Sequence, residues 1–313
     1  MNPAFSVILL TTLIGAGQGL FLALFAAEVV LKSQSTNTVD GVTFYAVGSA
    51  IALLLTGLGL LASFFHLGHP ERAWRAAAMW RTSWLSREVI VLPAFMSCVA
   101  LYGASHYFVW GYSAAIGAAG VVLCFGLFVC TAMIYAVIKF LQEWHSPLTI
   151  INYTLLGCAS GMVLATAFSA FTATSLTVHF GNAAVALTLL ALATRTAALI
   201  RNARLKPKST LQSAIGIAHP RIVQKAQGFM GGSFNTREFF HGQSRQYLRS
   251  VKWGFLLLTF VAPVILLLLG IQQSVAGLLT AAFVVQFVGL IAERWFFFAQ
   301  ANHPQNLYYQ TIS

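Results

Sequence analysis

Long apolar runs alternate with polar segments along the chain. A helix that spans a bilayer needs about 20 mainly apolar residues, and runs of this kind recur eight times, at residues 5–31, 43–65, 88–110, 112–138, 149–172, 178–200, 252–271 and 275–299. The runs lack the two-residue alternation of a membrane β-strand, and a helix satisfies its own backbone hydrogen bonds in lipid. The pattern predicts an all-α integral membrane protein with eight transmembrane helices in a single domain over residues 1–313.

The polar segments between the runs predict the orientation in the membrane. With eight spans, both termini and the second, fourth and sixth loops lie on one side, here called side A. Lys32 is the only one of the 18 lysines and arginines that falls on the opposite side, side B. Basic loops stay in the cytoplasm, so we expect side A and both termini to be cytoplasmic.

Composition excludes a soluble enzyme. Hydrophobic residues make up 58% of the chain and charged residues 8%, whereas a soluble domain has about 45–50% and about 25%. The net charge of +11 would suggest a nucleic-acid partner in a soluble protein, but here it belongs to the loops that set the topology, and we expect none. The four cysteines lie in apolar runs without a CxxC pair, so the sequence predicts no metal site.

The segment from about residue 201 to 251 is the only sizeable polar stretch, and it mixes basic residues with phenylalanines. A loop that is merely solvated has no need of these aromatic side chains. We expect this basic loop on side A either to lie on anionic lipid headgroups or to dock a soluble partner, and the residues leave both alternatives open.

Ionisable and strongly polar side chains at membrane depth are costly, which makes them functional candidates. Near side A they are His66, Arg87, Glu88, Glu293 and Arg294, with Gln18 and Tyr135 deeper in their runs. The two arginines also fit a role as helix anchors at the headgroups. The set suits a quinone, whose carbonyls need hydrogen-bond donors and whose oxygens each gain a proton on reduction. A transport site is the competing interpretation, although such sites usually lie near the membrane midplane.

Haem inside a helical bundle needs two axial ligands at depth. Most of the eight histidines lie in or beside side A loops, whereas His106 and His179 lie at the side B ends of their runs. These two histidines are the alternative, a pair of haem ligands at side B. The pattern as a whole predicts no haem on this chain.

Two neighbouring stretches resemble a known family. Residues 65–74 contain a histidine-leucine-glycine-x-proline signature, and residues 81–88 end in a serine-x-glutamate helix start. Together they resemble the membrane anchor subunits of dimethyl sulfoxide reductase (DmsC) and their relatives. Gln18 and Tyr135 are similar in position to polar residues of helices one and four in that family, whereas the adjacent pair Glu293 and Arg294 departs from the spacing expected in helix eight.

The resemblance implies a haem-free, eight-helix subunit of the bacterial inner membrane. Such a subunit exchanges electrons between the quinone pool (ubiquinone or menaquinone) and an iron–sulfur subunit, which is bound to a molybdopterin catalytic subunit. His66 and Glu88 are the implied catalytic residues that handle protons. The implied quinone-binding residues are Gln18, His66, Arg87, Glu88, Tyr135 and Glu293. The implied contacts to the iron–sulfur partner are Arg72, Arg75, Arg81 and Arg237.

The orientation separates branches of this family. The chain has a long basic loop, and its quinone site and partners are expected on a cytoplasmic side A. In these respects it most resembles the SoeC anchors of cytoplasm-facing sulfite dehydrogenases. This similarity implies sulfite oxidation coupled to quinone reduction. An exported dimethyl sulfoxide reductase, which oxidises quinol, requires the reverse orientation and is the alternative. A membrane transporter and a purely structural anchor that does not touch quinone are the competing interpretations from other classes.

Overall fold

Eight helical stretches of the computed structural model are long and apolar enough to cross a membrane, which confirms the predicted number of spans. The structure describes residues 1–34, 39–65, 67–223, 225 and 241–304, and it contains no strand in those ranges. The spanning stretches are α1 (Phe5–Ser33), η1 and α2 (Val42–Ala46 and Val47–Phe64), α3 (Trp84–Tyr107), α4 (Ser113–Ala136), α5 (Pro147–Thr172), α6 (Thr174–Ala203), α9, η3 and α10 (Arg245–Leu256, Leu257–Val261 and Ala262–Gln273), and α11 (Ala276–Ala299). Within the described ranges, two short helices, η2 (Pro70–Met79) and α7 (Leu211–Ile215), lie between spans.

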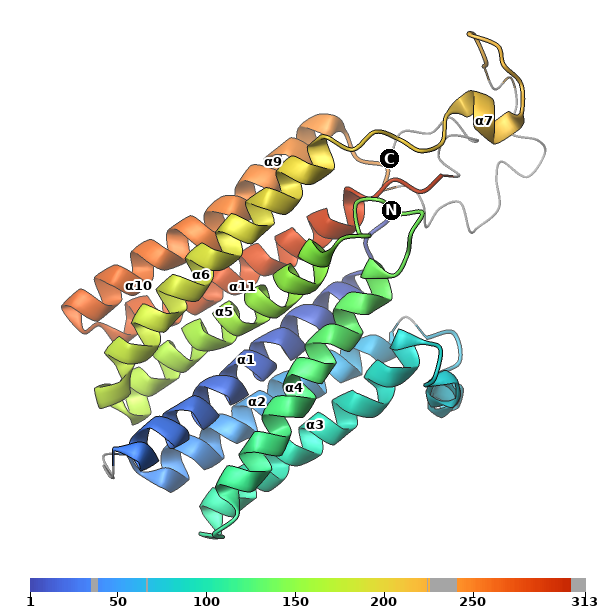
Figure 1. Ribbon diagram of the computed structural model, residues 1–313. Helices are drawn as coiled ribbons and strands as arrows, with labels where there is room; N and C mark the ends of the chain where they lie inside the picture. Colours follow the sequence, from blue (N-terminus) through green and yellow to red (C-terminus); the bar gives the residue numbers. More distant parts are fainter. Residues whose placement is uncertain (35–38, 66, 224, 226–240, 305–313) are drawn as a thin grey trace.

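Helices α1 and α5 pack against each other at the centre of the bundle. Helices α2, α3 and α4 extend the bundle on the α1 side, and α6, α10 and α11 extend it on the α5 side (Figure 1). Of the eight spans, α1 is the most buried. A helix that is apolar on every face is expected in such a central position. Side chains on α1 and α5 therefore face both halves of the molecule.

Glycines allow α1 and α5 to touch backbone to backbone. A Cβ added at Gly161 would lie 2.2 Å from the Cα of Gly19, and one added at Gly19 would lie 2.4 Å from the carbonyl oxygen of Gly157. Atoms cannot approach this closely, so each position excludes a side chain unless the helices separate. Small residues at a helix crossing serve this purpose in membrane bundles. The close crossing sets the spacing of the residues that line the cavity described below.

The start of α3 places a carboxyl group inside the bundle. Ser83 caps the helix, and its Oγ accepts a hydrogen bond from the backbone N–H of Ser86 at 3.4 Å. The helix consequently begins at Trp84, four residues before the predicted apolar run. Serine is a favoured cap because it satisfies a backbone donor at the helix start. Glu88 therefore lies just beyond the first turn of α3 and points into the protein.

Helix α6 carries a positive charge into the bundle, on one of the basic residues counted above on side A. The helix continues to Ala203, and Arg195 lies within it with only 2% of its side chain exposed. Glu293 of α11 lies 2.7 Å from its Nε atom. A buried arginine is tolerated when an acid pairs with it, so Arg195 lies inside the bundle, near the side A end of α6.

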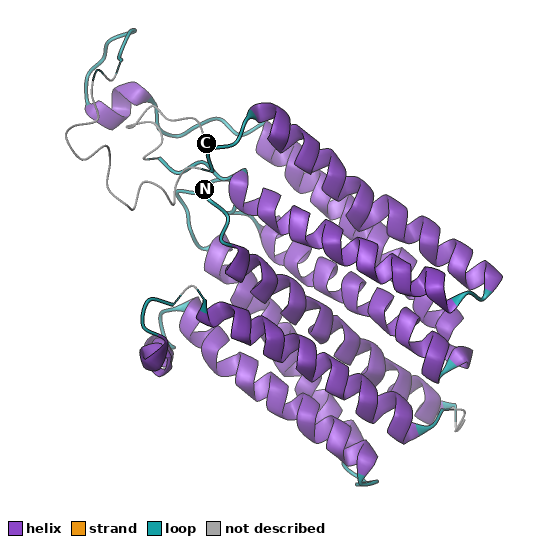
Figure 2. Ribbon diagram, turned by 180° about the vertical axis from the view of Figure 1, so that it is seen from behind, coloured by secondary structure: helices purple, strands orange, loops and turns teal. Residues whose placement is uncertain are grey.

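The N-terminus, the chain that follows α11, η2 and α7 all lie at the same end of the bundle (Figure 1). By the chain order this end is side A. Seen from behind, η2 stands clear of the spanning helices (Figure 2), in agreement with its having no buried residue. The predicted site residues His66 and Arg237, and much of the basic loop between residues 226 and 240, lie outside the described residues.

Candidate functional site

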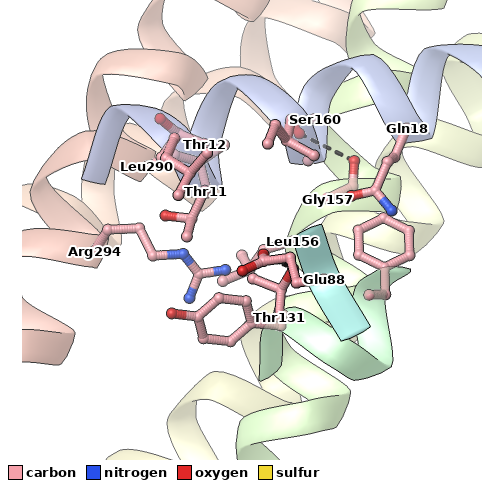
Figure 3. A pocket seen from close by; sticks show the side chains of 15 residues that line it. Thr11, Thr12, Gln18, Glu88, Thr131, Leu156, Gly157, Ser160, Leu290 and Arg294 are labelled. Carbon is pink, nitrogen blue, oxygen red and sulfur yellow. Dashed lines mark hydrogen bonds between the residues drawn. The ribbon is translucent and has the colours of Figure 1, made fainter. Parts of the chain in front are cut away.

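A cavity lies between α1, α3, α4, α5 and α11, in the half of the bundle nearer side A, and Figure 3 shows the side chains that line it. Its apolar walls come from Leu10, Ile14, Phe128, Leu156 and Leu290, and its polar lining residues are Thr11, Thr12, Gln18, Glu88, Thr131, Tyr153, Ser160 and Arg294. At about 1.5 Å per helical residue, Glu88 lies about 6 Å from the start of α3 and Gln18 about 20 Å from the start of α1. The cavity thus runs from near the headgroup level to near the membrane midplane.

Glu88 supplies the carboxyl group of this cavity. Its side chain is buried, with a relative exposure of 7%. One carboxyl oxygen accepts a hydrogen bond from the Thr131 hydroxyl of α4. A neutral hydroxyl holds the group in position without neutralising it. The carboxyl is therefore available as a proton donor or acceptor toward a molecule in the cavity.

Arg294 of α11 supplies the cation. Its guanidinium carbon lies 3.6 Å from the centre of the Tyr153 ring, and its Nη1 lies 3.4 Å from the carboxylate of Glu293. Figure 3 shows this guanidinium and the carboxyl group of Glu88 pointing toward each other within the lining of the cavity. Only 5% of the Arg294 side chain is exposed. Arg294 therefore lines the cavity, and the alternative interpretation as a headgroup anchor is wrong.

Tyr153 lies beneath this cation at the start of α5. Its hydroxyl is buried without a well-aligned hydrogen-bond partner, and it lies beside Tyr135, whose ring stacks on that of Tyr153 with centroids 5.6 Å apart. Buried hydroxyls without a partner are rare because each one costs free energy. The Tyr153 hydroxyl is thus a donor that a bound molecule or a water can satisfy.

Gln18 marks the deep end of the cavity. Its Nε2 donates a hydrogen bond of 2.9 Å to the backbone carbonyl of Cys124, which joins α1 to α4. The side chain is only 2% exposed to solvent, yet it lines the cavity. An amide at this depth has a second N–H and an oxygen to satisfy.

The remaining hydroxyls of the lining are already engaged within their own helices. Thr11 donates to the carbonyl of Ile8, Thr12 donates to the same carbonyl, and Ser160 donates to Gly157, at 3.1, 2.8 and 3.0 Å. The groups left to face a ligand are the carboxyl of Glu88, the guanidinium of Arg294 and the hydroxyl of Tyr153. Such donors above apolar walls fit a quinone, a flat apolar ring with two carbonyl acceptors.

A second, smaller cavity, here called the side pocket, lies next to the first and closer to side A. It contains the buried Arg195–Glu293 ion pair, and the two cavities share Tyr153 and Arg294 as lining residues. The sequence indicated Glu293 but gave no reason to join it to Arg195, because residues of α6 and α11 meet only in the folded bundle. Thr131 and Tyr153 carried no signal, since a lone hydroxyl in an apolar run is common.

The structure brings together only some of the predicted quinone-binding residues. Gln18 and Glu88 line the same cavity, whereas Tyr135 lies behind Tyr153 and Glu293 lies in the side pocket. Arg87 points back to the segment before α3, where it donates to the carbonyl oxygens of Trp80 and Arg81 at 2.9 and 2.8 Å. The predicted partner contacts Arg72, Arg75 and Arg81 are exposed at the side A end.

The two histidines near side B have different surroundings. His106 lies with its Nε2 3.5 Å from the buried carboxylate of Glu28 and stacks on Tyr45 with ring centroids 4.3 Å apart. His179 lies on an exposed face of α6. Among the described residues, neither belongs to a cluster of three or more potential metal ligands.

An eight-span bundle with a partly polar cavity in one half, and an exposed basic segment at the same end, has the features of a membrane anchor subunit. The chain belongs to the DMSO reductase anchor subunit (DmsC) family, which matches residues 1–309. A similar protein is the C chain of the sulfite dehydrogenase of Allochromatium vinosum. It is 55% identical over 331 aligned positions that cover the whole of both chains.

Proposed function

We propose that this chain is the quinone-reactive, haem-free membrane anchor of a sulfite-oxidising molybdoenzyme complex. It passes electrons from an iron–sulfur subunit to the quinone pool, while sulfite is oxidised on a separate molybdopterin subunit. Membership of the DmsC family and the full-length similarity to a sulfite dehydrogenase subunit support this proposal. The similarity favours sulfite oxidation over the alternative of a quinol-oxidising dimethyl sulfoxide reductase.

One observation carries the quinone assignment: a buried carboxyl, Glu88, and a buried guanidinium, Arg294, line the same largely apolar cavity. When bound, the quinone supplies two-electron, two-proton redox chemistry. Arg294 and Tyr153 provide hydrogen-bond donors for its oxygens, and Glu88 provides the nearby proton. Gln18 holds the deep end of the site. The apolar walls exclude water and accept the ring.

The other predicted residues act around this site. Glu293 and Tyr135 hold Arg294 and Tyr153 in place. Arg87 fixes the segment before α3 through its hydrogen bonds to the carbonyl oxygens of Trp80 and Arg81. Its guanidinium also lies 4.2 Å from the centre of the Trp84 ring. His66, which precedes that segment, remains the proposed partner of Glu88 in proton transfer. Glu88 and His66 are thus the proposed catalytic pair, and the other residues position the groups around them.

We further propose that side A faces the cytoplasm and that the chain lies in the bacterial inner membrane. The basic residues gather on the side A loops, as the positive-inside rule requires for cytoplasmic loops. With the quinone site in the same half of the bundle, electrons enter from a cytoplasmic partner. The catalytic and iron–sulfur subunits then bind on the cytoplasmic face.

The helix η2 and the residues just after it form the proposed docking surface for the iron–sulfur subunit. The helix buries none of its own residues, and Trp74, Met79 and Trp80 are 71%, 62% and 52% exposed. Arg75 and Arg81 lie against the rings of Trp74 and Trp80. Exposed aromatic and arginine side chains are typical of the centre of protein interfaces. Their positive charge suits an acidic partner surface.

Reversing charge on this surface is expected to weaken assembly. We expect Arg72→Glu combined with Arg75→Glu to lower the amount of iron–sulfur subunit that co-purifies with the anchor, because both charges then repel an acidic partner. The control is Lys139→Glu, an exposed charge reversal at the same end of the molecule and outside both η2 and the basic loop. Equal recovery of the partner with both variants would refute the assignment of this surface.

Sulfite-driven reduction of a short-chain quinone by membranes that contain the complex tests the function. We expect Gln18→Leu to raise the KM for quinone by about three- to tenfold with little change in kcat, because about one neutral hydrogen bond is lost. Gln273→Leu, an exposed change near side B, serves as the control. Quinol oxidation driven by dimethyl sulfoxide instead of sulfite would favour the alternative enzyme.

A further inference from the structure

The side pocket contains charged groups that its protein contacts leave incompletely satisfied. Arg195 and Glu293 approach to 2.7 Å, but the Nη2 of Arg195 and both oxygens of Glu293 lack well-aligned hydrogen bonds. These atoms are buried from bulk solvent. Buried polar atoms of this kind normally bind ordered water, provided that the space is polar and large enough. A water bound in the pocket satisfies them, and together with the neighbouring polar side chains it can pass on a proton.

The outer end of the side pocket reaches the loop between α4 and α5. Glu143 lines it there, and burial raises the pKa of the Glu143 carboxyl above its usual value. Asn302 donates to this carboxyl at 3.5 Å, the amide of Asn202 donates to the Glu143 backbone carbonyl at 3.4 Å, and the Met1 amine is the nearby charge. A carboxyl that holds a proton more readily than usual is suited to collect protons from side A.

The inner end of the side pocket reaches the candidate quinone cavity. Tyr153 and Arg294 line both spaces, so one tyrosine hydroxyl and one guanidinium form the common wall. Glu88 lies on the far side of this wall. The two cavities together connect the side A loops with the carboxyl group of α3.

We propose that the side pocket delivers protons through bound water from side A to Glu88, with Glu143 at its mouth and Tyr153 and Arg294 at its inner end. The proposal rests on the proposed reduction of quinone beside Glu88. For each quinone reduced, two electrons come from the iron–sulfur partner and two protons come from the side A solution. Glu88 gives the proton of its O–H bond to a quinone oxygen. It is reprotonated by the Tyr153 hydroxyl, which takes a proton from water in the side pocket as it gives up its own.

Glu293 has a positioning and electrostatic role in this route. Arg195 and Arg294 place two positive charges in the wall of the pocket, and both lie within ion-pair distance of Glu293. Positive charge opposes the passage of a proton, and this opposition is strong where water is scarce. The carboxylate of Glu293 cancels part of it and holds Arg294 against Tyr153.

Two substitutions interrupt the route without touching the quinone cavity. Glu143→Gln removes the carboxyl at the mouth and leaves an amide of the same shape. Asn152→Leu puts an apolar side chain of similar size into the middle of the pocket. Asn152 lines only the side pocket, and its hydrogen-bond donor Thr194 keeps a second acceptor, the carbonyl of Ala191, at 3.2 Å. Asp40→Asn, an exposed change near side B, is the matched control.

In the purified complex we expect both variants to lower the kcat for quinone reduction by about tenfold. The KM for quinone and the affinity for a quinone-site inhibitor are expected to stay within about twofold of wild type, because the quinone cavity is intact. Acetic acid, a small proton donor, is expected to restore the Glu143→Gln rate but not the Asn152→Leu rate, whose block lies deeper. Asp40→Asn is expected to behave as wild type.

An infrared measurement without quinone provides a second readout. The carboxyl band of Glu88 is the band that is lost in Glu88→Gln. In heavy water this band shifts as the carboxyl proton exchanges for deuterium, and we expect the exchange to be slower in Asn152→Leu than in wild type. If both pocket variants keep the wild-type kcat and the wild-type rate of hydrogen exchange at Glu88 while Glu88→Gln is inactive, the proton route is overturned and the proposed function is not. An active Glu88→Gln variant, together with no inhibitor binding by the wild type, would overturn the proposed function itself.

Discussion

Glutamine in place of Glu88 is expected to lower sulfite-driven quinone reduction by about a hundredfold or more while leaving the complex assembled. Glutamine keeps the size of the side chain and can still accept the hydrogen bond from Thr131, so the local structure should persist. It cannot exchange a proton, and a positioned acid or base contributes about 10²- to 10⁴-fold to such steps. The measurement is the steady-state rate with a short-chain quinone in membranes, normalised to co-purified catalytic subunit.

The conservative and control variants separate chemistry from structure. Glu88→Asp restores a carboxyl and is expected to recover part of the rate lost in Glu88→Gln. Glu28→Gln removes another buried carboxyl, near side B, where Glu28 pairs with Lys32 at 2.5 Å. Because it lies far from the cavity, we expect the rate per assembled complex to stay within about twofold of wild type. Quinone-linked turnover in Glu88→Gln equal to wild type would favour a purely structural anchor.

Glutamine in place of Glu293 is expected to destabilise the folded subunit by about 3–5 kcal/mol. The substitution leaves the charges of Arg195 and Arg294 buried with no carboxylate between them, and the side chain of each is at most 5% exposed. An uncompensated buried charge costs more than the ion pair contributes. The effect is measured by thermal unfolding of the purified complex, which is monitored as the loss of the intact assembly on size-exclusion chromatography.

A double substitution tests this electrostatic cause. Arg195→Met combined with Glu293→Leu replaces the ion pair with apolar side chains. It leaves one buried charge without a carboxylate, that of Arg294 on the ring of Tyr153, where Glu293→Gln leaves two. Apolar replacement of a buried pair is often neutral or stabilising, so the double variant is expected to be more stable than Glu293→Gln. Equal destabilisation of the two variants would show that packing around Glu293, and not its charge, stabilises the bundle.

The apolar pattern was sufficient to predict the fold class and the eight spans, because a helix in lipid must satisfy its own backbone and needs a minimum apolar length. The same argument pointed to Glu88 and Gln18, since polar groups are conspicuous in such runs. The short resemblance around residues 65–88 pointed to the DmsC family, which the match over residues 1–309 confirmed. These conclusions depend on local sequence and on transfer free energy, so no tertiary contact was needed.

The composition of the cavity depended on the tertiary structure. The sequence placed Arg195 only on side A, whereas the structure pairs it with Glu293 inside the bundle. Arg294 also fitted a headgroup anchor in the sequence but faces the carboxyl cavity. Tyr135 and Glu293 lie one layer behind the residues that line the cavity, while Thr131 and Tyr153 line it. Helix rotation and the close glycine crossing of α1 and α5 decide which side chains converge. Hydropathy carries little information on either, because almost every face of these helices is apolar.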